Sequence, residues 1–184
     1  MKVFPAEHPD ILIVEPQVYG DERGFFMETY HAEKYAAQGM DLPFVQDNHS
    51  RSRRGVLRGL HYQLEQAQGK LIRVVNGAIF DVAVDVRRGS PRFGSWVGLE
   101  LSDDNKRQMY IPPGFAHGFC VLSEEVDFLY KCTGFYAPDD EYGIAWDDPD
   151  IAIDWPQMDY LLSERDRQLP ALSGNRNLPA YSAN

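Results

Sequence analysis

The feature of this 184-residue chain that most restricts its fold is a series of short strand-like segments, each bounded by a turn signal. They span residues 11–15, 25–30, 45–49, 55–63, 70–76, 78–86, 96–101, 108–111, 118–122 and 126–133. Only residues 31–38, which are rich in alanine and followed by Gly39, predict a clear helix, and residues 163–166 predict the start of a short one. Many short strands with few helices predict an all-β sandwich or barrel. A jelly roll is one such form that hides its sheet edges and leaves room for a ligand.

Two neighbouring segments carry sharper predictions. Asn76 and Gly77 separate two strand patterns, which is a strong signal for a β-hairpin. In the second of these segments four apolar residues alternate with acidic or small ones, and Asp81 and Asp85 fall between them. This period of two is typical of a half-buried strand.

The chain shows no repeat, linker or low-complexity tract, so residues 1–184 are expected to form a single domain. The tail of about residues 170–184 contains Pro, Ser and Asn and is expected to be loose. The N-terminus lacks the apolar run of a signal peptide, and no stretch approaches the length of a membrane span. Cys120 and Cys132 lie in apolar segments, which fits a reducing cytoplasm, with a single buried disulfide as the alternative.

The net charge of −10 argues against nucleic acid and anionic membrane surfaces as partners. Six of the 18 basic side chains nevertheless lie within residues 51–73, beside a single acid, Glu65. These basic residues are Arg51, Arg53, Arg54, Arg58, Lys70 and Arg73. We interpret Arg58 and Lys70, which fall inside strand patterns, as contacts for a small anionic ligand, and the arginines at 51, 53 and 54 as a solvated loop.

The segment 55–63 reads as a strand in which Leu57, Gly59, His61 and Gln63 share one face. That face is unusual because it carries an imidazole beside a glycine, where a core face would carry hydrocarbon side chains. A glycine inside a strand often marks the close approach of a ligand or another backbone. His61 beside Gly59 therefore suggests a cavity with a base in its wall. Taken alone, a single histidine favours the alternative of a core residue satisfied by a hydrogen bond.

The residue types needed for several chemistries are missing. A metal site would need ligands in addition to His61 and His117, and position 63 is Gln rather than His. No phosphate-binding loop, dinucleotide-binding motif or nucleophile elbow occurs. These absences disfavour metal catalysis, nucleotide hydrolysis, hydride transfer and nucleophilic catalysis.

The residues that remain suit proton transfer next to a carbonyl group. His61 offers an imidazole, the side chain type best suited to act as a base near neutral pH, and Lys70 supplies a compact positive charge for an enolate oxygen. Tyr130 is a candidate acid, and a proton returned from the opposite face would invert the carbon. The alternatives are a core tyrosine with a buried hydrogen bond and a solvated lysine at a strand end.

Six motifs, in order, resemble the dTDP-4-dehydrorhamnose 3,5-epimerase family. They are found at residues 19–26, 45–50, 55–63, 68–71, 113–119 and 128–131. The resemblance extends from about residue 3 to residue 169. It implies a cupin-like jelly-roll barrel with short peripheral helices, which uses no metal or other cofactor and forms a homodimer.

The resemblance also implies the reaction and its catalytic residues. The expected activity is inversion of C3 and C5 of dTDP-4-dehydro-6-deoxy-D-glucose, giving dTDP-4-dehydro-L-rhamnose for dTDP-L-rhamnose and lipopolysaccharide synthesis. It makes His61 the proton acceptor, Tyr130 the proton donor, Asp166 the carboxylate that pairs with the histidine, and Lys70 the cation at the enolate. Without the resemblance, Asp166 reads as a capping acid of a short helix.

Further positions match substrate contacts of the family. Arg58 resembles a phosphate and sugar contact, and Tyr136 resembles the aromatic residue that stacks on thymine. Other matches, some reaching across the dimer, are Arg23, Glu28, Gln46, Asp47, Asn48, His117, Glu141 and Arg165. Two positions depart from the pattern: Tyr19 stands where Phe is common, and Arg165 where Lys is usual, which changes the geometry of a charged contact.

Three other functions stay open from the sequence. A relative that inverts one carbon or isomerises the ketone would share the barrel and the histidine. A metal-dependent cupin is disfavoured by Gln63. A non-catalytic nucleotide-sugar binding module would not need a histidine–carboxylate pair.

Overall fold

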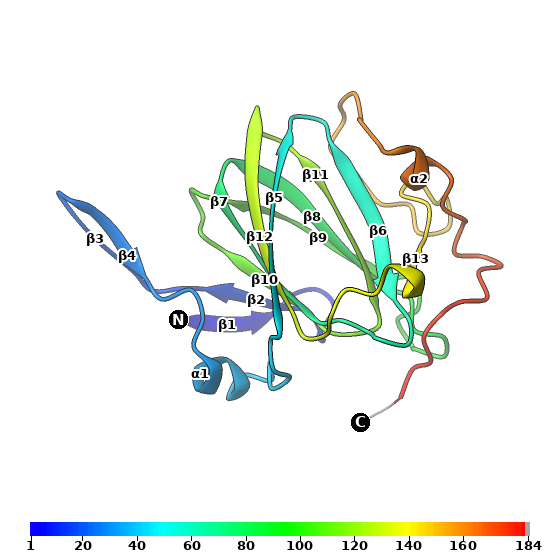
Figure 1. The fold of residues 1–184 in the computed structure, drawn as a ribbon, viewed down its shortest axis with the longest axis horizontal. Helices are drawn as coiled ribbons and strands as arrows, with labels where there is room; N and C mark the ends of the chain where they lie inside the picture. The colour runs from blue at the N-terminus through cyan, green and yellow to red at the C-terminus, as the bar shows by residue number, and fades with distance from the viewer. Residues whose placement is uncertain (183–184) are drawn as a thin grey trace.

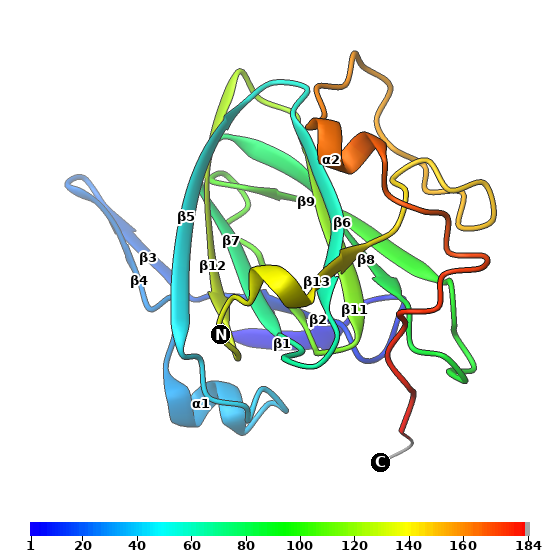
Figure 2. The same ribbon diagram turned by 45° about the vertical axis from the view of Figure 1, so that its right-hand side comes forward.

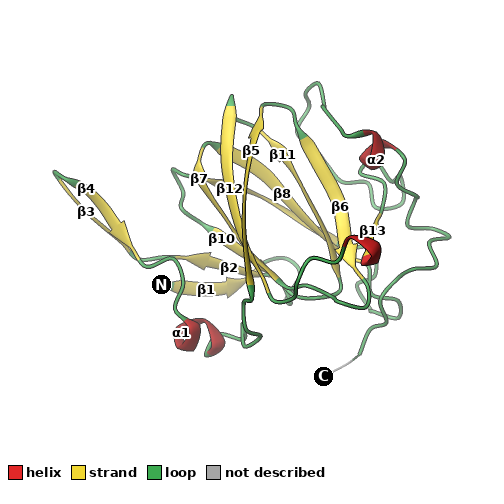
Figure 3. Cartoon of the chain, viewed as in Figure 1, coloured by secondary structure: helices red, strands yellow, loops and turns green. Residues whose placement is uncertain are grey.

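The computed structural model describes residues 1–182 and consists of two facing antiparallel β-sheets (Figure 1, Figure 3). The six-stranded sheet contains, in spatial order, β1 (Lys2–Pro5), β2 (Leu12–Glu15), β10 (Gln108–Ile111), β7 (Lys70–Asn76), β12 (Glu125–Cys132) and β5 (Gln46–Arg53). The five-stranded sheet contains β13 (Glu141–Gly143), β6 (Leu57–Gln63), β11 (Phe115–Val121), β8 (Ala78–Asp85) and β9 (Trp96–Ser102). This architecture confirms the predicted all-β class.

The remaining elements lie around the two sheets. A hairpin of β3 (Val18–Asp21) and β4 (Gly24–Met27) projects away from the barrel (Figure 1). The helices are short: α1 (Ala32–Ala36), the 3₁₀ helix η1 (Pro138–Asp140) and α2 (Glu164–Arg167). The predicted helices at 31–38 and 163–166 correspond to α1 and α2. No helix in residues 1–182 combines the length and apolar character needed to span a bilayer.

The main core fills the space between the sheets. It includes Ile72 and Phe128 from the six-stranded sheet, and Ile79, Ala83 and Phe119 from the five-stranded sheet, all buried. The core residues of one strand are an even number of positions apart, as Ile79 and Ala83 are, because successive side chains point to opposite faces. In β12 the hydrophobic alternation of the sequence therefore specifies which face of the strand turns inward.

A second core covers the outer face of the five-stranded sheet. There Val82 and Val84 of β8 pack with Ile144, Trp155 and Leu172, which come from the chain after β13. Asp81 and Asp85, on the other face of β8, are fully buried as well. The prediction of a half-buried strand is therefore wrong, because a segment without strand periodicity covers the face that would otherwise meet solvent.

The segment after Leu169, expected to be loose, lies against this covered face as far as the structure describes it. Leu172 and Leu178 are buried, the Tyr62 hydroxyl donates to the Asn177 carbonyl at 2.9 Å, and the Arg88 N–H donates to the Pro179 carbonyl at 2.7 Å. Figure 2 shows this segment passing along one side of the barrel, away from the β3–β4 hairpin. Residues 183 and 184 of the expected loose tail lie outside the described residues.

The predicted hairpin at Asn76–Gly77 is wrong. β7 and β8 belong to different sheets, so the turn carries the chain from one sheet to the other. Gly77 has a φ of +81°, and a Cβ there would collide with the carbonyl oxygen of Glu125. The Asn-Gly pair does mark a left-handed backbone, but this conformation does not specify that the flanking strands pair.

Candidate active site

A cavity of about 640 Å³ opens between the two sheets and brings together most of the residues singled out in the sequence. Its walls come from β5, β7 and β12 on one side and from β6 and β11 on the other, with β13 and α2 at its edge (Figure 2). The predicted residues that line it are Gln46, Asn48, Arg58, His61, Lys70, His117, Tyr130, Tyr136, Glu141, Arg165 and Asp166.

A bulge in β6 decides which of its side chains reach this cavity. His61 is paired with His117 and Arg58 with Phe119, so three steps along β6 match two along β11. The extra residue reverses the alternation, as β-bulges do. Arg58 therefore lines the cavity together with His61, and Leu57, which also borders the cavity, packs in the outer core. This contradicts the prediction that Arg58 and His61 lie on opposite faces of the strand.

Gly59 stands at this bulge. Its φ is +122°, and a Cβ there would lie 2.6 Å from the Gly118 Cα on β11. The expected close approach at Gly59 is thus the backbone of the neighbouring strand.

His61 is held by Asp166 from the end of the chain. The His61 Nε2 lies 2.6 Å from the Asp166 Oδ1, and Asp166 is buried on α2, where its N–H bonds to the Ser163 Oγ at 3.1 Å. Burial raises the pKa of Asp166, but the hydrogen bonds from His61, Ser163 and the Gly59 N–H outweigh it and lower that pKa. A carboxylate on Nε2 fixes the tautomer and leaves the His61 Nδ1 as the basic nitrogen.

A second histidine–carboxylate pair lies beside the first. The His117 Nε2 is 3.0 and 3.1 Å from the two carboxylate oxygens of Asp81, which is fully buried on β8. Burial raises the pKa of Asp81 and lowers that of His117. Asp81 was not singled out in the sequence, because the pattern of β8 placed it on a face expected to be polar.

Lys70 and Tyr130 stand on the wall opposite His61. Lys70 begins β7, where burial lowers the pKa of its ammonium group against the opposing charges of Glu141 and Asp81. Tyr130 on β12 packs its ring 5.3 Å from that of Phe128, and burial raises the pKa of its hydroxyl. Because β6 and β12 belong to different sheets, His61 and Tyr130 face the cavity from two sides.

Hydrogen bonds link the residues at the edge of the cavity. The Tyr136 hydroxyl donates to the Glu141 Oε2 at 3.2 Å, and Arg165 donates to the same oxygen and, at 3.2 Å, to the Glu141 carbonyl. The Tyr136 N–H donates to the Gln46 Oε1 at 2.9 Å. Arg58 and Arg165, together with Lys70, make this edge suitable for an anionic ligand.

Three predicted contacts lie away from the cavity in a single copy of the chain. Arg23, near the tip of the β3–β4 hairpin, pairs with Asp21 at 2.5 Å, and Glu28 pairs with Lys34 at 2.9 Å. Asp47 pairs with Lys131 at 2.8 Å.

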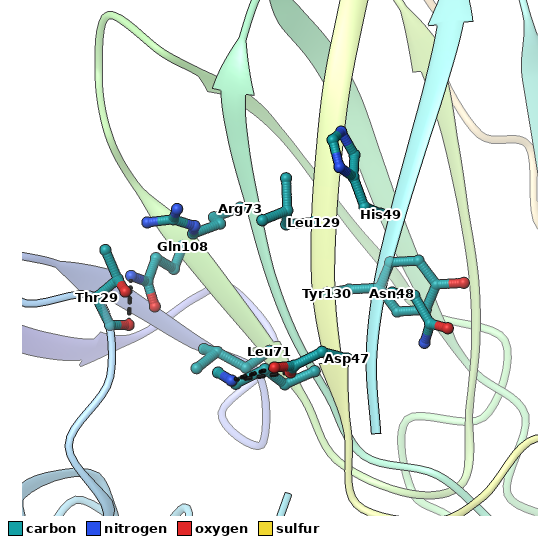
Figure 4. A pocket seen from close by; sticks show the side chains of 10 residues that line it. Thr29, Asp47, Asn48, His49, Leu71, Arg73, Gln108, Leu129 and Tyr130 are labelled. Carbon is teal, nitrogen blue, oxygen red and sulfur yellow. Dashed lines mark hydrogen bonds and ion pairs between the residues drawn. The ribbon is translucent and has the colours of Figure 1, made fainter. Parts of the chain in front are cut away.

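Asp47 lines a second, smaller cavity of about 250 Å³ (Figure 4). Asp47 and His49 line this cavity, whereas Gln46 and Ser50 line the first, so the two cavities occupy opposite faces of β5. The His61–Asp166 and His117–Asp81 pairs belong to the first cavity, whereas His49 of the second cavity pairs with Asp127 at 2.9 Å.

Within the described part of the chain, no group of three or more His, Cys, Asp and Glu side chains is arranged to hold a metal ion. Each cavity histidine uses its Nε2 for a carboxylate. Gln63, at the position considered for a third ligand, is bonded to backbone groups. Cys120 and Cys132 are free and buried.

The chain has clear relatives of known name. The sequence model described as dTDP-4-dehydrorhamnose 3,5-epimerase matches residues 5–174. A dTDP-4-dehydrorhamnose 3,5-epimerase of Pseudomonas aeruginosa is 61% identical over 170 residues, which are 91% of this chain and 94% of the relative.

Solved structures agree with this match. The dTDP-6-deoxy-D-glucose-3,5-epimerase of Legionella pneumophila, in complex with dTDP-4-keto-L-rhamnose, has a TM-score of 0.97 and 52% identity, with 99% of each chain covered. A 3′-monoepimerase of Streptomyces bikiniensis, in complex with dTDP-quinovose, has a TM-score of 0.91 and 35% identity over 97% of this chain and 93% of that one. The predicted cupin-like barrel is thereby confirmed. The two facing sheets, the paired histidine in the cavity between them and the near-complete match together show that this chain belongs to the dTDP-4-dehydrorhamnose 3,5-epimerase family.

Proposed function

We propose that this chain inverts C3 and C5 of dTDP-4-dehydro-6-deoxy-D-glucose to give dTDP-4-dehydro-L-rhamnose, in dTDP-L-rhamnose synthesis and without a metal ion. The observation that carries the proposal is the position of the His61–Asp166 pair and of Tyr130 on opposite walls of one cavity. The complex of the Legionella relative with dTDP-4-keto-L-rhamnose supports the choice of substrate.

The first half of each inversion is removal of a proton from carbon. The 4-keto group acidifies the C–H bonds at C3 and C5, and the His61 Nδ1 takes the proton while the bond's electron pair moves to the keto oxygen. Lys70 stabilises the enolate oxygen with its positive charge, and Asp166 stabilises the imidazolium that forms.

The second half returns a proton from the other side. The Tyr130 hydroxyl donates its proton to the enolate carbon, the carbonyl re-forms, and the configuration at that carbon is inverted. The tyrosinate then regains a proton and His61 releases one, so that both groups return to their starting states. The Tyr130 hydroxyl is protonated near neutral pH, since the ordinary pKa of tyrosine is about 10 and burial raises the pKa of Tyr130.

The edge of the cavity would hold the nucleotide. In this proposal Arg58 and Arg165 contact the diphosphate and sugar, and Tyr136 stacks on the thymine ring. Gln46, Asn48, His117 and Glu141 supply further polar contacts from the same cavity. Residues 1–184 would act as one epimerase domain in the cytoplasm.

Arg23, Glu28 and Asp47 do not line the first cavity of their own copy, so a role for them at the substrate requires a homodimer. The β3–β4 hairpin carries Phe25 and Phe26 with 59% and 69% of their surface exposed, and it projects from the barrel (Figure 1). Exposed aromatic residues grouped on a projecting element are typical of a protein–protein interface. We propose that the hairpin reaches a second copy and brings Arg23 and Glu28 to the substrate there.

The proposal is tested by proton NMR in deuterated water with dTDP-4-dehydro-6-deoxy-D-glucose, the enzyme and a chelator. Deuterium at both C3 and C5, with the L-configured product, is expected. The similarity to a 3′-monoepimerase makes inversion at one carbon the second candidate, and it would incorporate deuterium at C3 alone. Exchange that disappears on adding the chelator would contradict the metal-free mechanism. No exchange with or without the chelator would contradict catalysis and favour a nucleotide-sugar binding module.

A further inference from the structure

Gln63 is a buried amide at the end of β6, two residues after His61. Only 5% of its surface is exposed. Its Nε2 donates to the carbonyls of Gln66 and Phe135, at 2.8 and 3.1 Å, and its Oε1 accepts from the Ala137 N–H at 2.9 Å. The side chain thus ties the end of β6 to two loops.

Two of these bonds bracket Tyr136. Gln63 binds the carbonyl of the residue before Tyr136 and the N–H of the residue after it, and Gln46 binds the N–H of Tyr136 itself. The Tyr136 residue is 50% exposed, and its side chain contacts Glu141 and Arg165 through the hydroxyl at the end of the ring. The backbone that carries the ring is held separately, by Gln63 and Gln46.

We infer that Gln63 is a positioning residue for nucleotide binding, which holds the Tyr136 ring at the cavity edge before the thymine arrives. The inference rests on the proposed role of Tyr136. A half-exposed ring on a mobile loop would lose conformational entropy on binding, and a loop fixed in advance avoids that loss.

The chemistry of the amide explains why Gln suits this position. The site needs two donated hydrogen bonds and one accepted bond from a single side chain, and a neutral amide supplies all three. Glutamate keeps the acceptor but loses both donors, and methionine has nearly the same length but forms none of these bonds strongly. The two substitutions therefore separate the contributions of the amide.

A purely structural role for Gln63 would lower stability without a specific effect on the nucleotide. Gln108 on β10 is a matched control, because it is also a buried glutamine, with 1% of its surface exposed. Its Nε2 donates to the Thr29 carbonyl at 3.0 Å and its Oε1 accepts from the Tyr35 hydroxyl at 3.3 Å. It lines the second cavity and has no bond to the Tyr136 loop within residues 1–182.

The test measures the dissociation constant of dTDP by calorimetry for Gln63→Met, Gln108→Met, Tyr136→Ala and the double variant Gln63→Met/Tyr136→Ala. We expect Gln63→Met to weaken dTDP binding by about tenfold, equivalent to about 1.4 kcal/mol. Gln108→Met should bind dTDP within about twofold of the unchanged protein, although its melting temperature also falls. In turnover, KM of Gln63→Met should rise by a larger factor than kcat falls.

The double variant decides whether Gln63 acts through Tyr136. In the Tyr136→Ala background, adding Gln63→Met should weaken dTDP binding by no more than about twofold, because the ring that Gln63 positions is gone. Additive losses, equal losses in Gln63→Met and Gln108→Met, or unchanged binding in Gln63→Met would each overturn the inference. If Gln63→Met does not fold, Gln63→Glu replaces it, and a loss at least as large is expected because a carboxyl oxygen then faces the carbonyls of Gln66 and Phe135.

The same measurements separate this inference from the function on which it rests. Unchanged dTDP binding in Tyr136→Ala would reject the stacking role of Tyr136, and the inference with it. Weakened binding in Tyr136→Ala with unchanged binding in Gln63→Met would reject the inference about Gln63 alone.

Discussion

His61 and His117 lie directly opposite each other on β6 and β11, and the Nε2 of each ring is bonded to a carboxylate. The two pairs differ in access and in the direction in which the pKa of the carboxyl group is shifted. The His61 side chain is partly exposed to the cavity and the pKa of its partner Asp166 is lowered, whereas Asp81 and His117 are buried and burial raises the pKa of Asp81. This difference suits the first pair to proton exchange and the second to holding a fixed hydrogen-bonding group.

Replacing the base should stop exchange at both carbons. We expect His61→Ala to lose deuterium incorporation at C3 and at C5 by at least about a hundredfold, a typical contribution of a general base. Proton NMR in deuterated water measures both positions in one experiment. Normal turnover by His61→Ala would show that another group is the base.

Replacing the acid should separate exchange from inversion. In Tyr130→Phe we expect deuterium exchange or a single inversion to continue, because the base is intact, while the L-configured product does not form. Tyr110→Phe is the control, since Tyr110 is also buried but does not line the first cavity. Full product formation by Tyr130→Phe would assign the acid elsewhere.

Removing the charge of Asp81 should change the pH dependence of catalysis. Its carboxylate raises the pKa values of His117 and Lys70 against the lowering effect of burial. In Asp81→Asn that support is lost, so the pKa of Lys70 falls further and the alkaline limb of the kcat/KM profile should move to lower pH. An unchanged alkaline limb would show that Lys70 deprotonation does not limit activity there.

Asp127 should stabilise the fold near neutral pH and lose that contribution in acid. Hydrogen bonds from Arg51 and His49 lower its pKa to about 2, below its usual value of 3.8. Since the folded pKa is lowered, the stabilisation is present above the unfolded pKa and is lost as pH falls toward 2. In Asp127→Asn the difference in melting temperature between pH 6 and pH 2.5 should therefore shrink, and an unchanged difference would contradict this assignment.

The dimer can be tested by complementation between inactive copies. Arg23→Ala should raise KM by roughly tenfold or more, the usual loss for a charged hydrogen bond. In a dimer mixed from Arg23→Ala and His61→Ala chains, one of the two sites would combine an intact Arg23 with an intact His61. We expect the mixture to recover activity that neither variant has alone at low substrate concentration. No recovery after verified subunit exchange would mean that Arg23 serves its own copy or none.

The sequence predicts the strands of this fold better than their surroundings. The alternation of Phe128, Tyr130 and Cys132 along β12 puts them on one face of the strand, and all three line the cavity. The prediction that β8 is half-buried failed because residues after β13, which show no strand or helix periodicity, cover its outer face. The prediction for β6 failed because one extra residue in a bulge moves Arg58 to the other face of the strand. A bulge depends on how two strands pair, and the residues of one strand alone do not specify that pairing.

The site shows the same division between local and distant information. His61, Lys70 and Tyr130 are recognisable by residue type within strand patterns. Asp166 is 105 residues from His61 in the sequence, and from the residues alone it reads as a helix cap, so only the family resemblance singled it out. The sequence did not predict a role for Asp81, because its contact with His117 arises from burial and burial is determined by the tertiary fold.

The segment that covers the outer face of the five-stranded sheet also carries α2, and with it the partner of His61. Detachment of that segment would separate Asp166 from His61 while the strand ladders of both sheets stayed intact. We therefore expect catalytic competence to be lost on detachment of residues 144–182, about a fifth of the chain, before the barrel melts. On warming, activity should disappear before the amide hydrogens of β7, β8 and β11 begin to exchange rapidly.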